Sequence, residues 1–282
     1  MAERFEFVLE VVEALVVGPA AGGDIRQYPL RIGALPSDPV RFVKLAKQVY
    51  TDLEQRRLSV AGELHPGVRT AFELLAEHRV AVSVTGIDGL GADVAVLAVT
   101  DGAQALGITQ APETDQLLFS LFADEELVDV VTGVLPPAPA ATTGAHTVRR
   151  GATRQVSAMT ERRIAEAEAE EEETDAFGNI EVRGVVRPGR RRPAPPAKKS
   201  DTAVLEQVLT APRLGGGHLA VTGFGRHGER ISGDPVSWLD TGDGRYLVHA
   251  RTGEAGDFTA DYVPAGRAEL SRAIRAAIAA VY

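Results

Sequence analysis

The residue pattern with the clearest chemical potential is a glycine string from Gly223 to Gly228, which reads GFGRHG. It matches the GxGxxG signature of dinucleotide-binding loops, which hold a pyrophosphate because a helix follows them and points free backbone N–H groups at it. Here the turn-forming residues 232–235 follow, and after them comes another strand pattern. We therefore predict that Gly223–Gly228 connects two strands of a hairpin and binds no nucleotide.

A second glycine cluster, Gly215–Gly217, precedes this string. A phosphate-binding P-loop would end in Gly-Lys-Ser or Gly-Lys-Thr, whose side chains reach the phosphates and magnesium, and that ending is missing. Glycine has no side chain beyond its hydrogen, so it also lets two backbones approach closely. The cluster is thus predicted to let a strand start beside another backbone.

Titratable residues around these glycines raise the question of an enzyme or a metal site. His218, His227 and His249 lie near Asp234 and Asp240 in the sequence. No serine elbow and no HExxH pairing accompanies them, and the chain contains no cysteine. We predict ordinary sheet histidines, no catalytic residue, no metal site and no cofactor.

Composition narrows the classes of partner. The chain has 282 residues, of which 44% are hydrophobic and 24% charged, so a sizeable core is expected. Its net charge of −9 argues against general nucleic-acid binding. Neither an N-terminal hydrophobic region nor an unbroken apolar run of about 20 residues is present, which predicts a cytoplasmic protein that does not insert into membranes.

Hydrophobic periodicity predicts the elements that position these residues in the N-terminal half. Phe5–Leu9 alternates as a strand and continues into a short helix; Asp38 and then His65 each precede a proline that opens a helix. From Val80 the period changes to two. Four strands are expected, at Val80–Thr85, Asp93–Val99, Ala103–Ile108 and Gln116–Leu121, followed by a helix from Asp124 that Pro136 ends.

The C-terminal half repeats this order of elements. A tight turn at Thr241–Gly244 should fold Trp238–Asp240 back on Arg245–Leu247. Helices are expected at 201–210 and 266–282, and strands at 219–224, 235–240, 245–250 and 257–262. Both halves therefore run helix, four strands, helix. The expected fold class is α+β, with two pseudo-symmetric halves, each an antiparallel β-sheet packed with helices.

The halves are separated by a stretch of different composition, residues 136–200, which is rich in proline and charge. An acidic block at 166–175 precedes a basic end at 187–199. Too few apolar residues are present to offset the loss of backbone entropy, so we predict a largely disordered linker rather than an anion or nucleic-acid contact. The expected domains are 1–135, the linker 136–200 and 201–282.

Two short motifs stand out in the C-terminal half: Pro212–Arg213 leads into the glycine-rich strand start Gly215–Gly217, and Trp238–Thr241 is followed by Gly244–Leu247. These motifs and their order resemble the EspG family of type VII (ESX) secretion-associated proteins of actinobacteria. The duplicated plan of helices and four strands also resembles the family's pseudo-twofold α+β architecture. The acidic and basic insertion at 161–199 departs from the compact family pattern.

The resemblance implies a cytoplasmic chaperone without catalysis, which keeps a secretion substrate of the PE–PPE heterodimer type soluble for export. In the family a hairpin loop of the N-terminal sheet and helices of the C-terminal half hold the helical substrate. The matching loop here is Ile87, Asp88, Gly89 and Leu90. Ile87 and Leu90 are apolar residues at a turn; they either face a partner or fold back onto the sheet.

Two other classes of function stay open at the level of sequence. One is a small-molecule hydrolase or nucleotide-binding enzyme, against which stands the lack of a nucleophile, base and orienting group at recognisable spacing. The other is a structural protein that assembles through its duplicated sheets, which the acidic composition neither supports nor excludes.

Overall fold

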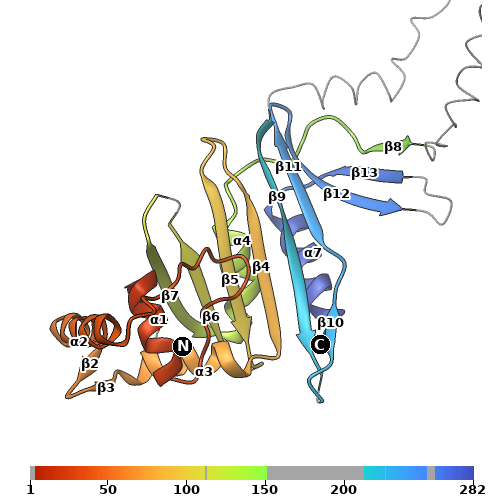
Figure 1. Cartoon of the computed structure of the whole chain (residues 1–282). Coiled ribbons are helices and arrows are strands. Elements are labelled where there is room, and N and C mark those ends of the chain that lie inside the picture. Colours follow the sequence, from red (N-terminus) through yellow and green to blue (C-terminus); the bar gives the residue numbers. More distant parts are fainter. Residues whose placement is uncertain (1–3, 112, 151–212, 226, 253–257) are drawn as a thin grey trace, which may run out of the picture. The chain divides into compact units, whose positions relative to one another are not determined.

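The computed structural model describes residues 4–111, 113–150, 213–225, 227–252 and 258–282 (Figure 1). One compact unit holds Met1–His146, Glu206–His249 and Asp261–Tyr282, and a second holds Thr147–Leu205 and Ala250–Ala260. The expected helix at 201–210, the acidic block and the basic end lie outside the described residues. The division into domains 1–135, 136–200 and 201–282 stays a prediction.

Helices and strands alternate through the N-terminal half much as the periodicity predicts. Each of the four predicted strands is present within two residues of its predicted bounds. The elements are β1 (Phe5–Glu10), α1 (Val11–Ala20), α2 (Pro39–Gln55), β2 (Ser59–Val60), β3 (Glu63–Leu64), α3 (Pro66–Glu77), β4 (Val80–Ile87), β5 (Asp93–Thr100), β6 (Gln104–Gln110), β7 (Gln116–Ala123), the 3-10 turn η1 (Asp124–Glu126) and α4 (Leu127–Val134).

Both predicted proline helix starts are confirmed, and a side chain caps each of them. The Asp38 carboxylate accepts hydrogen bonds from the backbone N–H groups of Val40 (2.8 Å) and Arg41 (3.3 Å) at the start of α2. His65 Nδ1 accepts from the backbone N–H of Gly67 (3.1 Å) at the start of α3. These acceptors satisfy N–H groups that have no partner inside the helix.

The C-terminal half is built mainly of strands. Its elements are β9 (Arg213–Phe224), β10 (Arg230–Ser232), β11 (Val236–Thr241), β12 (Gly244–Thr252), β13 (Phe258–Pro264) and α7 (Arg267–Ala279); β8 (His146–Arg150) lies in the stretch expected to be a linker. β10 pairs with the end of β9, so the GxGxxG string is a hairpin connection as predicted. His227 lies in that turn, which corrects its prediction as a sheet residue.

The strands of both halves join into one sheet. The order is β1-β7-β6-β5-β4-β9-β11-β12-β13-β8, with β10 beside β9. β4 pairs antiparallel with β5 on one side and with β9 on the other, from Val80 opposite Gly223 to Ile87 opposite Gly216 (Figure 1). The α+β fold class is confirmed, and the two expected sheets are continuous through β4 and β9.

Helices cover both faces of this sheet and create two cores. Leu97 and Val99 of β5 pack into the core under α1, α2 and α3, while their neighbours Val96 and Ala98 face a core with α4 and α7. This division follows from the alternation of side chains along a strand. The second core also contains residues of β4, β9 and β11. Helix α4 and the C-terminal helix α7 therefore pack on the same face of the joined sheet.

A buried ion pair anchors the chain that leaves α4. Arg245 of β12 donates from Nε to Asp240 Oδ1 (2.6 Å) and from Nη2 to Asp240 Oδ2 (2.7 Å). Nη2 also donates to the backbone carbonyl of Pro136 (2.6 Å). Arg245 is 3% exposed and Asp240 5%, so the pair connects β11, β12 and the first residue of the expected linker inside the protein.

Asp243, in the turn between β11 and β12, is a second carboxylate that accepts several hydrogen bonds. It accepts hydrogen bonds from the Thr142 hydroxyl, the backbone N–H of Thr143 (2.9 Å) and the Tyr246 hydroxyl (2.7 Å). These bonds, that of Thr142 first, hold the pKa of Asp243 far below its ordinary value. Residues 142–143 are therefore fastened to the turn by a group that needs its negative charge.

This arrangement predicts a specific acid sensitivity. Because the folded pKa of Asp243 is depressed, its stabilisation is complete above the unfolded value of about 3.9 and is lost as the pH falls below it. We expect the wild type to lose only about 1 kcal/mol more stability between pH 5 and pH 3 than Asp243→Asn, because water reaches the carboxylate and screens its interactions. Thermal melts of both proteins at each pH measure the difference; parallel losses would contradict it.

Candidate functional site

The hairpin between β4 and β5 carries the four residues that the sequence singles out. Its loop, Asp88–Ala92, closes through hydrogen bonds from Asp88 N to Ala92 O (2.9 Å) and from Gly91 N to Asp88 O (3.0 Å). The Asp88 carboxylate also accepts from the backbone N–H groups of Leu90 and Ala92, both at 2.8 Å. Asp88 thus fixes the turn, and Gly91 takes the positive φ of 84° that the turn requires.

Two apolar side chains project from this fixed turn. Leu90 is 95% exposed and Ile87 is 50% exposed, so they do not fold back together onto the sheet as the alternative interpretation required. Single exposed apolar residues are common in proteins, but here the exposed pair stands on a rigid hairpin. Because the loop is already ordered, it should lose little conformational entropy when a partner binds its apolar side chains.

Strand β9 supports the hairpin on one side. Ile87 lies opposite Gly216 in the sheet, and a Cβ atom on Gly89 would lie 3.0 Å from the backbone oxygen of Leu214. Leu214 is itself an exposed apolar residue, at 46%. Sequence periodicity missed this neighbour because it started the strand at Leu219, whereas β9 begins at Arg213. The glycine cluster carries no apolar signal that would have extended the strand.

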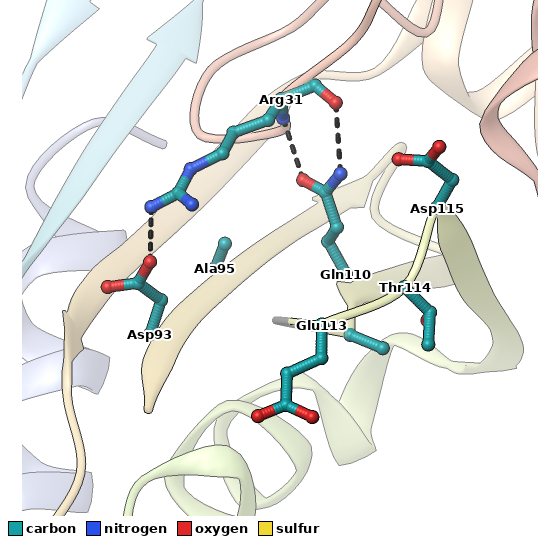
Figure 2. Close-up of a pocket in the computed structure, with 8 residues that line it drawn as sticks. Arg31, Asp93, Ala95, Gln110, Glu113, Thr114 and Asp115 are labelled. Carbon is teal, nitrogen blue, oxygen red and sulfur yellow. Dashed lines mark hydrogen bonds and ion pairs between the residues drawn. The ribbon is translucent and has the colours of Figure 1, made fainter. Parts of the chain in front are cut away.

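The other side of the hairpin is held by Arg31, which belongs to a polar pocket of about 330 Å³ (Figure 2). The Arg31 guanidinium contacts the Asp93 carboxylate at 2.5 Å, at the first residue of β5. The Gln110 side chain accepts from Arg31 N (2.7 Å) and donates to Arg31 O (2.9 Å). The long loop before α2 is thereby fastened to the loop end of the hairpin.

The chemistry of this pocket is that of a support. Arg31 bonds to both Asp93 and Gln110, and the remaining polar lining residues include Glu113 and Asp115 from the loop between β6 and β7 (Figure 2). The lining contains no histidine, serine or lysine, and among the described residues neither its carboxylates nor the Thr114 hydroxyl belong to a hydrogen-bonded pair of nucleophile and base. Across the part of the chain that the structure describes, no group of three His, Asp or Glu side chains is placed to hold a metal ion.

A second pocket, of about 400 Å³, lies directly beside the hairpin loop. Its walls come from the hairpin, from Gly215–Gly217 and from Trp238 and Leu239 of β11. A Cβ atom on Gly217 would overlap the Thr85 carbonyl oxygen and lie 2.5 Å from Trp238 Cη2. The prediction that this cluster admits close backbone approach is confirmed, and the indole also occupies the space that the glycine leaves.

The histidines of the C-terminal half are not brought together. His218 bonds to the Thr85 hydroxyl (3.1 Å) and lies 3.4 Å from the Tyr28 hydroxyl on an exposed face of the sheet. Its register partner Ser237 pairs with Val248, so His249 faces the opposite side. The Asp240 carboxylate is engaged in the ion pair with Arg245. Both sheet histidines match their prediction, and their arrangement offers no catalytic pair.

Among the described helices, none is long and apolar enough to cross a membrane.

The candidate site consists of a hydrogen-bonded hairpin with exposed Ile87 and Leu90, a neighbouring exposed Leu214, and a pocket against β9 and β11. Such a combination of a few apolar side chains with a polar surround suits contact with another protein.

Comparisons with known proteins agree with this assignment. A protein-family model described as the EspG family matches residues 10–276. Among solved structures, the type VII secretion system chaperone EspG5 of Mycobacterium tuberculosis, in complex with a PE25–PPE41 dimer, is similar with a TM-score of 0.58. The sequences are 10% identical, and the match covers 99% of this chain and 97% of that one. No curated protein matches in sequence.

Proposed function

Because the chain belongs to the EspG family, we propose that it is a chaperone of type VII (ESX) secretion that binds a PE–PPE heterodimer, its client. The chaperone holds the helical client soluble until export. The family match over residues 10–276 is the observation that carries this proposal. The shared fold with EspG5, which was solved with a PE25–PPE41 dimer, supports it.

We place part of the client contact on the hairpin residues Ile87, Asp88, Gly89 and Leu90. Asp88 and Gly89 form the rigid turn, and Ile87 and Leu90 supply the exposed apolar surface. A helical client that must be kept from aggregating exposes apolar side chains, which these residues can cover. Their polar surroundings, such as Arg31 and Asp93 beside the loop, keep the free chaperone soluble.

The proposed activity needs no catalysis, cofactor or metal, because holding a client depends only on binding free energy. The EspG family is a chaperone family, which favours a protein that is not an enzyme. A client that awaits export is met before it crosses the membrane, so we infer that the chaperone acts in the cytoplasm. The net charge of −9 fits a protein partner better than a nucleic acid.

Co-expression tests this function directly. The full-length chain carrying an affinity tag is co-expressed with a panel of PE–PPE heterodimers, including PE25–PPE41, and complexes are analysed by size-exclusion chromatography with light scattering. We expect at least one heterodimer to co-purify and to stay soluble only when the chaperone is present. Capture of no heterodimer would refute the proposal, and self-association alone would favour a structural protein.

A further inference from the structure

Beside the hairpin, the sheet surface has a notch at Gly216, where register partners on β4, β9 and β11 form one row across the sheet. Ile87 of β4 lies opposite Gly216 of β9, and Gly216 lies opposite Leu239 of β11. Residues directly opposite one another in a sheet point to the same face. Two apolar side chains therefore flank a position that has none, and both are accessible, since Ile87 is 50% exposed and Leu239 is half-buried.

Gly216 is less crowded than the glycines on either side of it. A Cβ atom on Gly217 would overlap the Thr85 carbonyl oxygen, and one on Gly215 would lie 2.8 Å from the Ile87 oxygen. At Gly216 a Cβ atom would lie 3.1 Å from the Trp238 oxygen, 3.6 Å from Leu239 Cα and 3.7 Å from Leu239 Cδ1. Of these atoms only the Trp238 oxygen is closer than ordinary contact, and the sequence has glycine at this position.

The pocket around the notch also has a cation at its edge. Arg213 lines it, is exposed, and makes no ion pair with any residue that the structure describes. The last turn of a helix ends in carbonyl groups without intrahelical partners and carries a partial negative charge. An arginine beside an apolar notch therefore suits the C-terminal end of a helix that presents one apolar side chain.

The geometry points to a specific docking mode, which rests on the proposed chaperone function: the pocket receives the C-terminal turn of a client helix. One apolar side chain of that turn inserts over Gly216 between Ile87 and Leu239. The free carbonyl groups of the turn face Arg213. Ile87 then belongs both to the hairpin contact and to the wall of the notch, so the two surfaces form one continuous binding site.

Filling the notch tests this mode. Gly216→Val places a branched side chain where the client residue would insert, and valine is well accepted in strands. We expect at least a tenfold loss of affinity for a heterodimer that the wild type binds, measured by isothermal titration, and a smaller loss for Gly216→Ala. Gly133→Ala serves as the control, because its Cβ would meet only Arg267 Nη2, at 3.8 Å, and it lies outside the pocket. Unchanged affinity of folded Gly216→Val would overturn the docking mode.

Two further variants keep the test decisive if Gly216→Val does not fold. Leu239→Ala removes one wall and Arg213→Ala removes the cation, and each is expected to weaken binding about fivefold or more. The chain has a single tryptophan, Trp238, which lines the pocket. Labelled with 5-fluorotryptophan, it should give one ¹⁹F resonance that shifts when the heterodimer binds. Binding that leaves both variants at wild-type affinity and this resonance unmoved would overturn the docking mode.

The outcomes also separate this inference from the proposed function. If the wild type binds no PE–PPE heterodimer, the chaperone function fails and the docking mode fails with it. If the wild type binds but the variants at Gly216, Leu239 and Arg213 bind equally well, the docking mode alone is wrong.

Discussion

Replacing Asp240 with alanine should lower the free energy of unfolding by about 3–5 kcal/mol, the largest effect on stability that we expect from one substitution. The Arg245 guanidinium would stay buried, at 3% exposure, with the Pro136 carbonyl as its remaining partner. A buried charge without its counter-charge is strongly destabilising, because the protein interior solvates it poorly. Urea denaturation of Asp240→Ala and the wild type at pH 7 measures the loss.

The exposed Arg31–Asp93 pair supplies a matched control. Its side chains are 69% and 42% exposed, against 4% and 7% for Arg245 and Asp240. Asp93→Ala should cost no more than about 1 kcal/mol, because water already screens that pair. In the double variant Asp240→Ala with Arg245→Met, much of the lost stability should return. Equal losses for Asp240→Ala and Asp93→Ala would show that burial does not govern the strength of these pairs.

For binding, the largest effect is expected from Ile87→Asp combined with Leu90→Asp. Two carboxylates would enter a contact from which water is excluded, costing several kcal/mol of binding, or more than a hundredfold in affinity. Folding should persist, because Leu90 is 95% and Ile87 50% exposed, and exposed substitutions usually change stability by about 0.5 kcal/mol or less. Co-purification of a PE–PPE heterodimer and the melting temperature are measured together.

Helix α2 offers an equivalent change elsewhere on the surface. Val40 and Val43 are 65% and 66% exposed, so Val40→Asp with Val43→Asp adds the same charges away from the hairpin. This control should bind the heterodimer as the wild type does. Undiminished co-purification by the hairpin variant would remove Ile87 and Leu90 from the site, while a collapse of its melting temperature would assign them to the core.

Local sequence signals predicted most elements of this fold because those elements carry strong periodicity. Buried and partly buried residues alternate along β4, and α2 begins at Pro39 with its first N–H groups capped by Asp38. β10 and the β2–β3 hairpin escaped prediction. They are two or three residues long and mostly exposed, so they bury too little apolar surface to leave a pattern.

Long-range features were beyond local reasoning for a different reason. The pairing of β4 with β9 joins Val80–Ile87 to residues more than 120 positions later, and no local periodicity specifies such a partner. The turn at Thr241–Gly244 was predictable, yet the burial of Asp240 with Arg245 depends on Pro136 and the cores around it. The hairpin residues Ile87–Leu90 came from the family resemblance, and their role in binding stays a prediction.

The β4–β9 pairing also affects how the chain is made in the cell. Until β9 leaves the ribosome, β4 has an unpaired edge with buried-type valines at Val80, Val82 and Val84. Synthesis from Ile87 to Phe224 takes roughly 7–27 s at about 5–20 residues per second. Throughout that interval the nascent N-terminal half presents an open strand of the kind that pairs with other chains. A protein proposed to shield others from aggregation therefore itself passes through an aggregation-prone stage, and slowing translation between these strands should lower its soluble yield.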